Sequence, residues 1–104
     1  MVDNRKRKLT AEEILLELKK RRKELRDKFG VKRIGLFGSY SINKQTKNSD
    51  IDIFVEFKEK SFDNVVGLWN FLEVKFNKKI DLIYKHKNSN KQIIENIQKR
   101  VIYG

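Results

Sequence analysis

The chain has 104 residues, which is the length of one domain with a core of modest size, so we interpret residues 1–104 as a single domain. It carries 25 Lys and Arg residues against 14 Asp and Glu residues, a formal net charge of +11. It contains no cysteine, which excludes disulfides and thiolate metal sites. No segment approaches the ~20 apolar residues that span a membrane, and the first residues lack the apolar stretch of a signal peptide, so we expect a cytoplasmic location.

The excess of positive charge is compatible with several partners. It favours polyanions, a nucleoside triphosphate or an acidic protein. The basic run at residues 5–8 could contact nucleic acid, but we interpret residues 1–9 as a flexible basic arm, because such short runs are common at frayed termini. Heavy use of Lys, Asn and Ile can also reflect coding bias, so charge alone does not select a function.

The N-terminal third predicts a helix, a strand and a turn. Thr10 and Glu13 form a capping-box pattern, and apolar residues at helical spacing continue to Phe29, before a stop at Gly30. The expected elements that follow are a strand at 31–37, a turn at Gly38–Ser39, a short helix at 40–45 and a polar loop at 46–49.

The rest of the chain predicts two more strands and two more helices. Residues 50–57 alternate, with apolar side chains on one face and Asp50, Asp52, Phe54 and Glu56 on the other. Ser61 caps a helix whose apolar stripe is Val65, Leu68, Trp69, Leu72 and Phe76. A strand at 79–84 follows, and Asn88 or Ser89 caps a last helix with the stripe Ile93, Ile94, Ile97 and Val101.

This order of elements predicts an α/β fold of the α+β kind. We expect a small mixed sheet of three strands with helices mainly on one face, which leaves the other face available for a site.

Three carboxylates stand in strands. Asp50 and Asp52, at i and i+2, point to the same face about 6.5–7 Å apart. Asp81 lies among isoleucines and a leucine, where an ionised carboxylate is costly unless it is paired or metal-bound. Hard divalent cations prefer such oxygen ligands, and two of them can stabilise both the attacking and the leaving oxygen of a phosphoryl transfer. The alternative is that Asp50 caps the loop, Asp52 faces water and Asp81 pairs with a lysine.

The turn at Gly38–Ser39 stands just upstream of these carboxylates. Gly38 has no side chain, so its backbone can approach phosphates closely, and the free amides of a helix beginning there would favour an anion further. Together, the parts predict a metal-dependent nucleotidyl-transfer site, with Gly38 and Ser39 binding the nucleotide and Asp50, Asp52 and Asp81 binding metal.

The spacing resembles a known signature. Gly38-Ser39, ten residues and then Asp50-Ile51-Asp52, preceded by Ser49 and followed by Asp81 in a later strand, resemble the polymerase-β-like nucleotidyltransferase superfamily. The small size is similar to its minimal nucleotidyltransferase (MNT) branch, the antitoxin half of HEPN–MNT toxin–antitoxin pairs. The resemblance implies two Mg²⁺ ions, replaceable by Mn²⁺, on the three aspartates, and ATP held by the Gly-Ser turn. It implies that AMP passes from ATP to a hydroxyl, typically of tyrosine, on a partner HEPN RNase toxin.

Two other function classes stay open. Ile42 stands where the family often has an arginine, with Lys44 or Lys47 as substitute charges, and this favours a catalytically weak antitoxin that neutralises its toxin by binding alone. A small basic nucleic-acid-binding module would explain the charge but not the three aspartates, which repel phosphate. Three further residues have more than one interpretation. Tyr40 lines the nucleotide site or packs under the turn, and His86 is a surface loop residue or a catalytic base. Tyr103 is an aromatic residue exposed on the last helix, where it could meet a partner.

Overall fold

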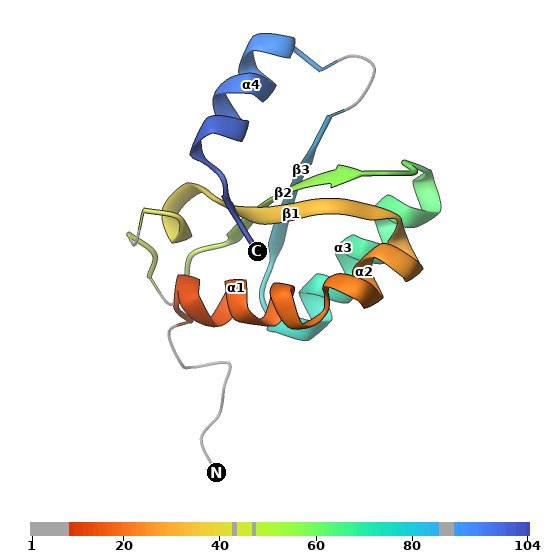
Figure 1. Cartoon of the computed structure of the whole chain (residues 1–104). Helices are drawn as coiled ribbons and strands as arrows, with labels where there is room; N and C mark the ends of the chain where they lie inside the picture. The colour runs from red at the N-terminus through yellow and green to blue at the C-terminus, as the bar shows by residue number, and fades with distance from the viewer. Residues whose placement is uncertain (1–8, 43, 47, 86–88) are drawn as a thin grey trace.

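A computed structural model describes residues 9–42, 44–46, 48–85 and 89–104. The elements in chain order are α1 (Ala11–Lys20), α2 (Arg22–Phe29), β1 (Val31–Phe37), the 3₁₀ turn η2 (Gly38–Tyr40), β2 (Ile51–Phe57), α3 (Phe62–Phe76), β3 (Ile80–Tyr84), α4 (Lys91–Arg100) and β4 (Ile102–Tyr103) (Figure 1). Of the predicted basic arm, residues 1–9, the structure describes Leu9 alone, and Leu9 packs against the core. Lys47, His86 and Asn88 lie outside the described residues.

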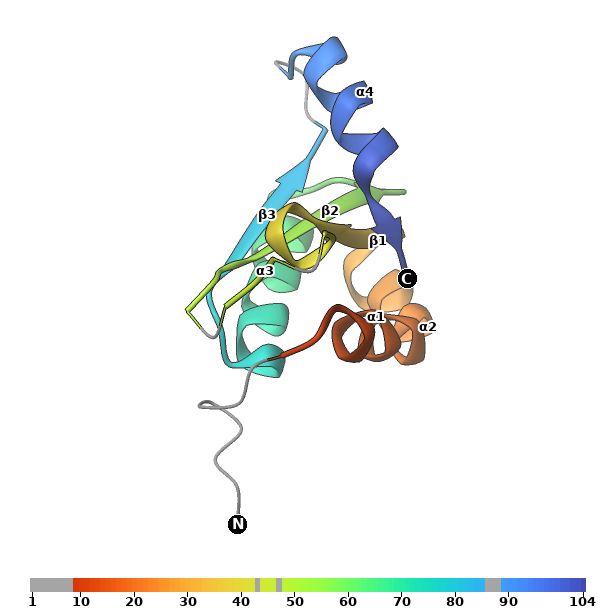
Figure 2. The ribbon, with the colours of Figure 1, turned by 90° about the vertical axis from the view of Figure 1, so that its left-hand side faces the viewer.

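The strands form one mixed sheet in the order β3-β2-β1-β4. Strand β2 is parallel to β3, and β1 is antiparallel to both β2 and β4. Helices α1, α2 and α3 lie on one face of the sheet, while α4 stands on the other side (Figures 1 and 2). The predicted α+β fold with a small mixed sheet is confirmed.

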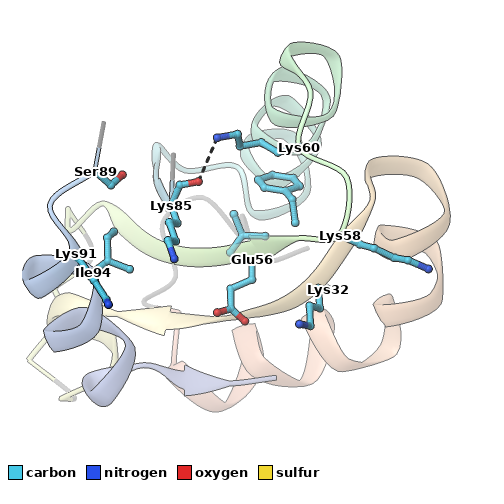
Figure 3. A pocket seen from close by; sticks show the side chains of 10 residues that line it. Lys32, Glu56, Lys58, Lys60, Lys85, Ser89, Lys91 and Ile94 are labelled. Carbon is cyan, nitrogen blue, oxygen red and sulfur yellow. Dashed lines mark hydrogen bonds between the residues drawn. The ribbon is translucent and has the colours of Figure 1, made fainter. Parts of the chain in front are cut away.

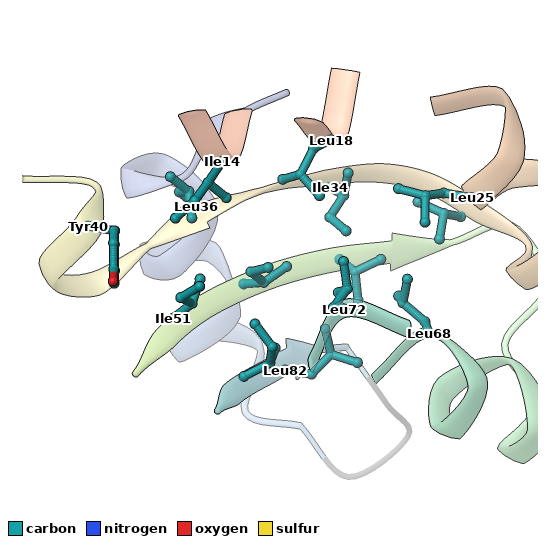
Figure 4. Packing of buried hydrophobic residues seen from close by; sticks show 14 of the residues in the cluster. Ile14, Leu18, Leu25, Ile34, Leu36, Tyr40, Ile51, Leu68, Leu72 and Leu82 are labelled. Atoms are coloured by element: carbon teal, nitrogen blue, oxygen red, sulfur yellow. The ribbon is translucent and has the colours of Figure 1, made fainter. Parts of the chain in front are cut away.

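The core lies between the sheet and helices α1–α3 (Figure 4). The inward residues of β2, which are Ile51, Ile53 and Val55, are fully buried, as their alternation predicts. Each fully buried side chain of this kind stabilises the fold by roughly 1.5–3 kcal/mol. Phe54, on the opposite face of the same strand, is also fully buried, so that face is not open along its whole length.

The predicted N-terminal helix is two helices. The cap is as expected, since the Glu13 amide donates to Thr10 Oγ1 at 3.1 Å, and Gly30 ends α2 in the left-handed region at φ 66°. Between them the chain bends at Arg21, whose φ of −100° and ψ of 11° are not helical. The bend allows both short helices to place apolar side chains, such as Leu18 and Leu25, against one twisted sheet.

Two other local predictions are wrong. The short helix expected at 40–45 is instead the 3₁₀ turn at Gly38–Tyr40, which the extra freedom of Gly38 permits. The last helix ends at Arg100, and its cap is Asn90, whose Oδ1 accepts from the amides of Gln92 and Ile93. Ser89 is therefore not the cap.

The last residues form a fourth strand, β4, that was not predicted. Gly35 of β1 makes room for it, because a Cβ at that position would overlap the carbonyl oxygen of Ile102 and the side chain of Val101. Tyr103 therefore lies on a strand and not on the last helix, and its ring is covered by the Arg33 guanidinium, 4.4 Å from the ring centroid. A strand of two residues is too short for a sequence period to reveal.

Candidate active site

Asp52 and Asp81 are neighbours on the sheet. They are register partners in the parallel pair of β2 and β3, whose backbones lie about 4.8 Å apart in such a pair. Asp52 is half-buried and Asp81 is exposed. The two aspartates, 29 residues apart in the sequence, thus meet at the start of both strands, as the sequence predicted.

The surroundings of Asp52 disfavour its charge. Burial raises the pKa of Asp52, and the negative charges of Asp81 and Asp50 raise it further. A hydrogen bond with the Asp81 carboxyl group acts in the same direction. Two carboxylates held this close repel each other at neutral pH. A bound cation would offset this repulsion, which follows from the way the fold places the two side chains.

Gly38 lies directly against the Asp52 carboxyl group. Phe37, the last residue of β1, is the register partner of Asp52, so the turn that follows begins beside this carboxylate. Gly38 adopts φ 74°, and a Cβ at this position would overlap Asp52 Oδ2. Only glycine fits both the backbone conformation and the close approach.

Ser39 lies half-buried within the same turn. The Ser41 hydroxyl donates to the Gly38 carbonyl at 2.7 Å, and the Lys44 amide donates to the Ser39 carbonyl at 2.9 Å. These bonds hold the turn beside the carboxylates by engaging its carbonyl groups. The predicted nucleotide-binding pair, Gly38 and Ser39, is thus adjacent to Asp52.

Asp50 lies at the margin of the carboxylate pair. It precedes β2, its side chain is 50% exposed, and its Oδ2 is 4.0 Å from Lys79 Nζ. Among the described residues, no group of three or more His, Cys, Asp and Glu side chains is placed to hold a metal ion. The chemistry of the Asp52–Asp81 pair, two oxygen donors that repel each other, fits a hard divalent cation. The three-ligand centre with Asp50, Asp52 and Asp81 stays a prediction.

Tyr40 packs under the turn and does not line the site. Its side chain is fully buried, and burial together with the charge of Asp50 raises the pKa of its hydroxyl. In the described part of the chain, this hydroxyl has no hydrogen-bond partner. Nearby, Ile42 is 64% exposed and Lys44 is exposed, so neither side chain is buried in the site.

A second hollow lies at the other end of β2 and β3, and sequence reasoning missed it. Five lysines line this pocket of about 590 Å³, which we call the lysine pocket: Lys32, Lys58, Lys60, Lys85 and Lys91. The sequence signal was a lysine near each strand end; the sheet brings the lysines of these strand ends together, and α4, on this side of the sheet, adds Lys91. Within the described residues, no helix combines the length and the apolar character needed to cross a bilayer.

Comparison with known sequences gives a consistent assignment. The nucleotidyltransferase domain family matches residues 18–103. The protein adenylyltransferase MntA of Thermococcus cleftensis is 38% identical over 96 residues, which cover 91% of this chain and 96% of that protein. A Methanocaldococcus jannaschii protein, named as a candidate protein adenylyltransferase, is 43% identical over 97 residues, which cover 90% of this chain and 97% of that protein.

Solved structures share the fold. A candidate minimal nucleotidyltransferase superposes with a TM-score of 0.68 at 23% identity and covers 85% of this chain and 93% of its own. A toxin–antitoxin structure with AMP-PNP superposes with a TM-score of 0.63 at 23% identity, covering 81% of this chain and 69% of its own. At this level of identity the likeness concerns the fold alone.

Proposed function

Because the chain belongs to the nucleotidyltransferase domain family, we propose that it is an antitoxin that transfers AMP from ATP to a tyrosine hydroxyl of a partner toxin. The observation that carries the proposal is the contact of Gly38 with the carboxyl group of Asp52, next to Asp81 on the neighbouring strand. This places a phosphate-compatible turn beside two convergent carboxylates. The relatives named as protein adenylyltransferases support a protein acceptor.

Each site residue has a role in this reaction. Gly38 and Ser39 hold the triphosphate, because the bare Cα of Gly38 leaves room for phosphate oxygens. Asp50, Asp52 and Asp81 hold Mg²⁺, two ions in the full site, or Mn²⁺ in its place. When bound, the metal neutralises the charge that develops on the phosphates.

The acceptor hydroxyl oxygen attacks the α-phosphorus of ATP. The bond from this phosphorus to the bridging oxygen of pyrophosphate breaks, and pyrophosphate leaves. Asp81, the exposed member of the pair, orients the hydroxyl and accepts its proton. Asp52, half-buried against Gly38, stays fixed beneath the phosphates.

The partner in this proposal is a separate folded protein, an RNase of the HEPN type, and the reaction takes place in the cytoplasm. The relatives named as protein adenylyltransferases support an acceptor of this kind. The toxin–antitoxin structure with AMP-PNP, which shares the fold, is consistent with a toxin partner and an adenine nucleotide.

Ile42 favours one competing function, neutralisation of the toxin by binding alone. Its side chain is apolar and 64% exposed at the turn, where a cationic phosphate contact would serve catalysis. An exposed apolar side chain is better suited to a protein contact than to a phosphate.

Intact-mass spectrometry of the partner separates the two functions. The partner is incubated with ATP, Mg²⁺ and this protein, and each transferred AMP adds about 329 Da when pyrophosphate leaves by in-line displacement. The Asp52→Asn variant and a reaction with EDTA are the controls, and both should leave the mass unchanged. A suppressed toxin of unchanged mass in the wild-type reaction would favour neutralisation by binding alone.

A further inference from the structure

The lysine pocket concentrates positive charge on one side of the sheet. Its lysines come from β1, from the segments that follow β2 and β3, and from the start of α4. Figure 3 shows Lys32, Lys85 and Lys91 arranged around Glu56, while Lys58 extends away from it. The Lys60 ammonium donates to the Lys85 carbonyl at 3.4 Å, which ties the two segments of the wall together.

Among the described residues of the lining, Glu56 is the one acid, and it does not neutralise these lysines. Glu56 is already paired with the Arg33 guanidinium, and it also accepts a hydrogen bond from Gln98 Nε2 at 2.8 Å. Between described residues, no ion pair is formed by the ammonium groups of Lys85 and Lys91 or by that of Lys58. The pocket therefore carries an uncompensated excess of positive charge.

Helix α4 adds to this excess. It begins at the pocket, since Ser89 and Lys91 both line it, and its first turn contains no acidic residue. The amides at a helix N-terminus carry a partial positive charge that favours anions. The lysines and the helix end thus act in the same direction.

The pocket lies on the sheet face that carries the candidate active site. Asp52 and Glu56 are four residues apart on β2, so both point to the same face, about 13 Å from each other. Lys85 likewise follows Asp81 by four residues and lies directly after the end of β3. A segment that placed one residue at the carboxylates could reach the pocket with a residue about four positions away when extended.

We propose that the lysine pocket is the docking site for an acidic segment of the protein that accepts AMP. This inference rests on the proposed function, for which it names the chemistry of the acceptor. Carboxylates of the segment pair with Lys32, Lys85 and Lys91, and this pairing holds the acceptor hydroxyl near Asp81. Charge pairing of this kind speeds association and selects the partner.

A protein segment suits the pocket better than a nucleic acid. The aromatic residue among its described lining is Phe57, whose ring is engaged edge-on by Tyr84 at a centroid distance of 6.0 Å. Single-stranded nucleic acids are bound by aromatic rings on which bases stack, and this ring is partly buried in the core.

The test begins with binding in the absence of ATP. A fluorescent peptide with a tyrosine and a cluster of glutamates about four residues away is titrated with the full chain, and a peptide with glutamines in place of the glutamates is the control. Charge reversal in the pocket, Lys85→Glu with Lys91→Glu, should weaken binding of the acidic peptide at least about tenfold. The matched pair Lys20→Glu with Lys23→Glu changes the net charge equally on exposed residues of α1 and α2, across the sheet, and should leave binding nearly unchanged.

A third variant guards against effects of misfolding. Glu56→Gln removes the acid of the pocket and should tighten binding of the acidic peptide about two- to fivefold, which a damaged fold cannot do. The proposal would be overturned if the two double-lysine variants lost affinity for the acidic peptide equally. It would also be overturned if wild type bound the glutamate peptide no more tightly than the glutamine peptide. The proposal would also be overturned if a single-stranded oligonucleotide bound more tightly than the peptide and this binding were lost in the pocket variant.

The transfer reaction then separates the pocket from the active site. With the partner protein as acceptor, the pocket variant should raise the KM for the partner at least about tenfold while the KM for ATP stays unchanged. If wild type and the pocket variant transfer AMP to the partner equally well, the assignment of the pocket as the docking site is wrong and the proposed function stands. If wild type transfers no AMP, the proposed function fails, and the peptide titration still decides whether the pocket binds acidic segments.

Discussion

The carboxyl group of Asp52 is held between Gly38 and Asp81. On one side, the Asp52 carboxyl group occupies the space that a Cβ at position 38 would need. On the other side, the register of β2 and β3 places Asp81. Two carboxylates in this arrangement cost folding energy in the absence of a cation, because burial and mutual repulsion disfavour their charge. Groups kept at such a cost are typical of functional sites.

The first prediction concerns the charge of Asp52. Because burial and the Asp81 charge disfavour its ionised form, Asp52→Asn should raise the melting temperature of the metal-free protein at neutral pH. The same variant should lose the stabilisation by Mg²⁺ and lower AMP transfer at least about 100-fold. Thermal melts with and without Mg²⁺ and ATP check this. The control is Asp63→Asn in the first turn of α3, whose melting temperature should respond to Mg²⁺ as that of wild type does. If Mg²⁺ raised the melting temperature of Asp52→Asn as much as that of wild type, Asp52 would not be a metal ligand.

A second prediction compares two glycines with positive φ. Gly38→Ala and Gly30→Ala both force an alanine into the left-handed region, at φ 74° and 66°, which costs roughly 1–2 kcal/mol each. Only the Cβ at position 38 also overlaps the Asp52 carboxyl group. We expect both variants to lose stability in urea denaturation and only Gly38→Ala to lose AMP transfer. Similar activity losses in the two variants would show that the effect is general and not local to the turn.

Tyr40 supports a third prediction. Its buried hydroxyl has no hydrogen-bond partner among the described residues, so Tyr40→Phe removes an unsatisfied polar group without leaving a cavity. The free energy of unfolding should stay unchanged or rise by up to about 1 kcal/mol, whereas Tyr40→Ala should lower it by about 3–5 kcal/mol. Nucleotide affinity measured by calorimetry should be unchanged in Tyr40→Phe. A marked loss of affinity would instead make the hydroxyl a nucleotide contact.

The last prediction is a pH dependence. The hydrogen bond from Arg33 lowers the pKa of Glu56, so the stabilisation by this pair is present above the unfolded pKa of about 4.3 and is lost as the pH falls through the lower folded pKa. Since the Arg33 side chain is 51% exposed, Glu56→Gln should cost no more than about 1 kcal/mol at neutral pH. Urea denaturation of both proteins at neutral and at acidic pH measures the difference, which should shrink on acidification. A difference that is constant with pH would mean that packing, and not charge, explains the loss.

Local patterns in the sequence were sufficient for much of this fold. The cap at Thr10, the stop at Gly30 and the alternating strand at 50–57 depend on side chains within one turn or one strand. The cap and the stop are confirmed, and the strand is confirmed from Ile51 onward, with Asp50 just before it. The bend at Arg21 was missed, because the apolar spacing continues through it and only the shape of the sheet beneath requires two helices. Strand β4 was missed because it depends on the space that Gly35 leaves on another strand.

Local patterns alone predict that Asp52 lies at the start of an apolar strand, shortly after a glycine turn, because both features depend on neighbouring residues. It also placed Asp81 in a strand, where an isolated charge is costly. No local pattern predicts that β2 and β3 run parallel in a register that pairs Asp52 with Asp81, since this pairing depends on how α3 returns the chain to the sheet. The lysine pocket also depends on the tertiary structure: its lysines come from four separate segments, which the pairing of the strands brings together and to which α4 adds Lys91.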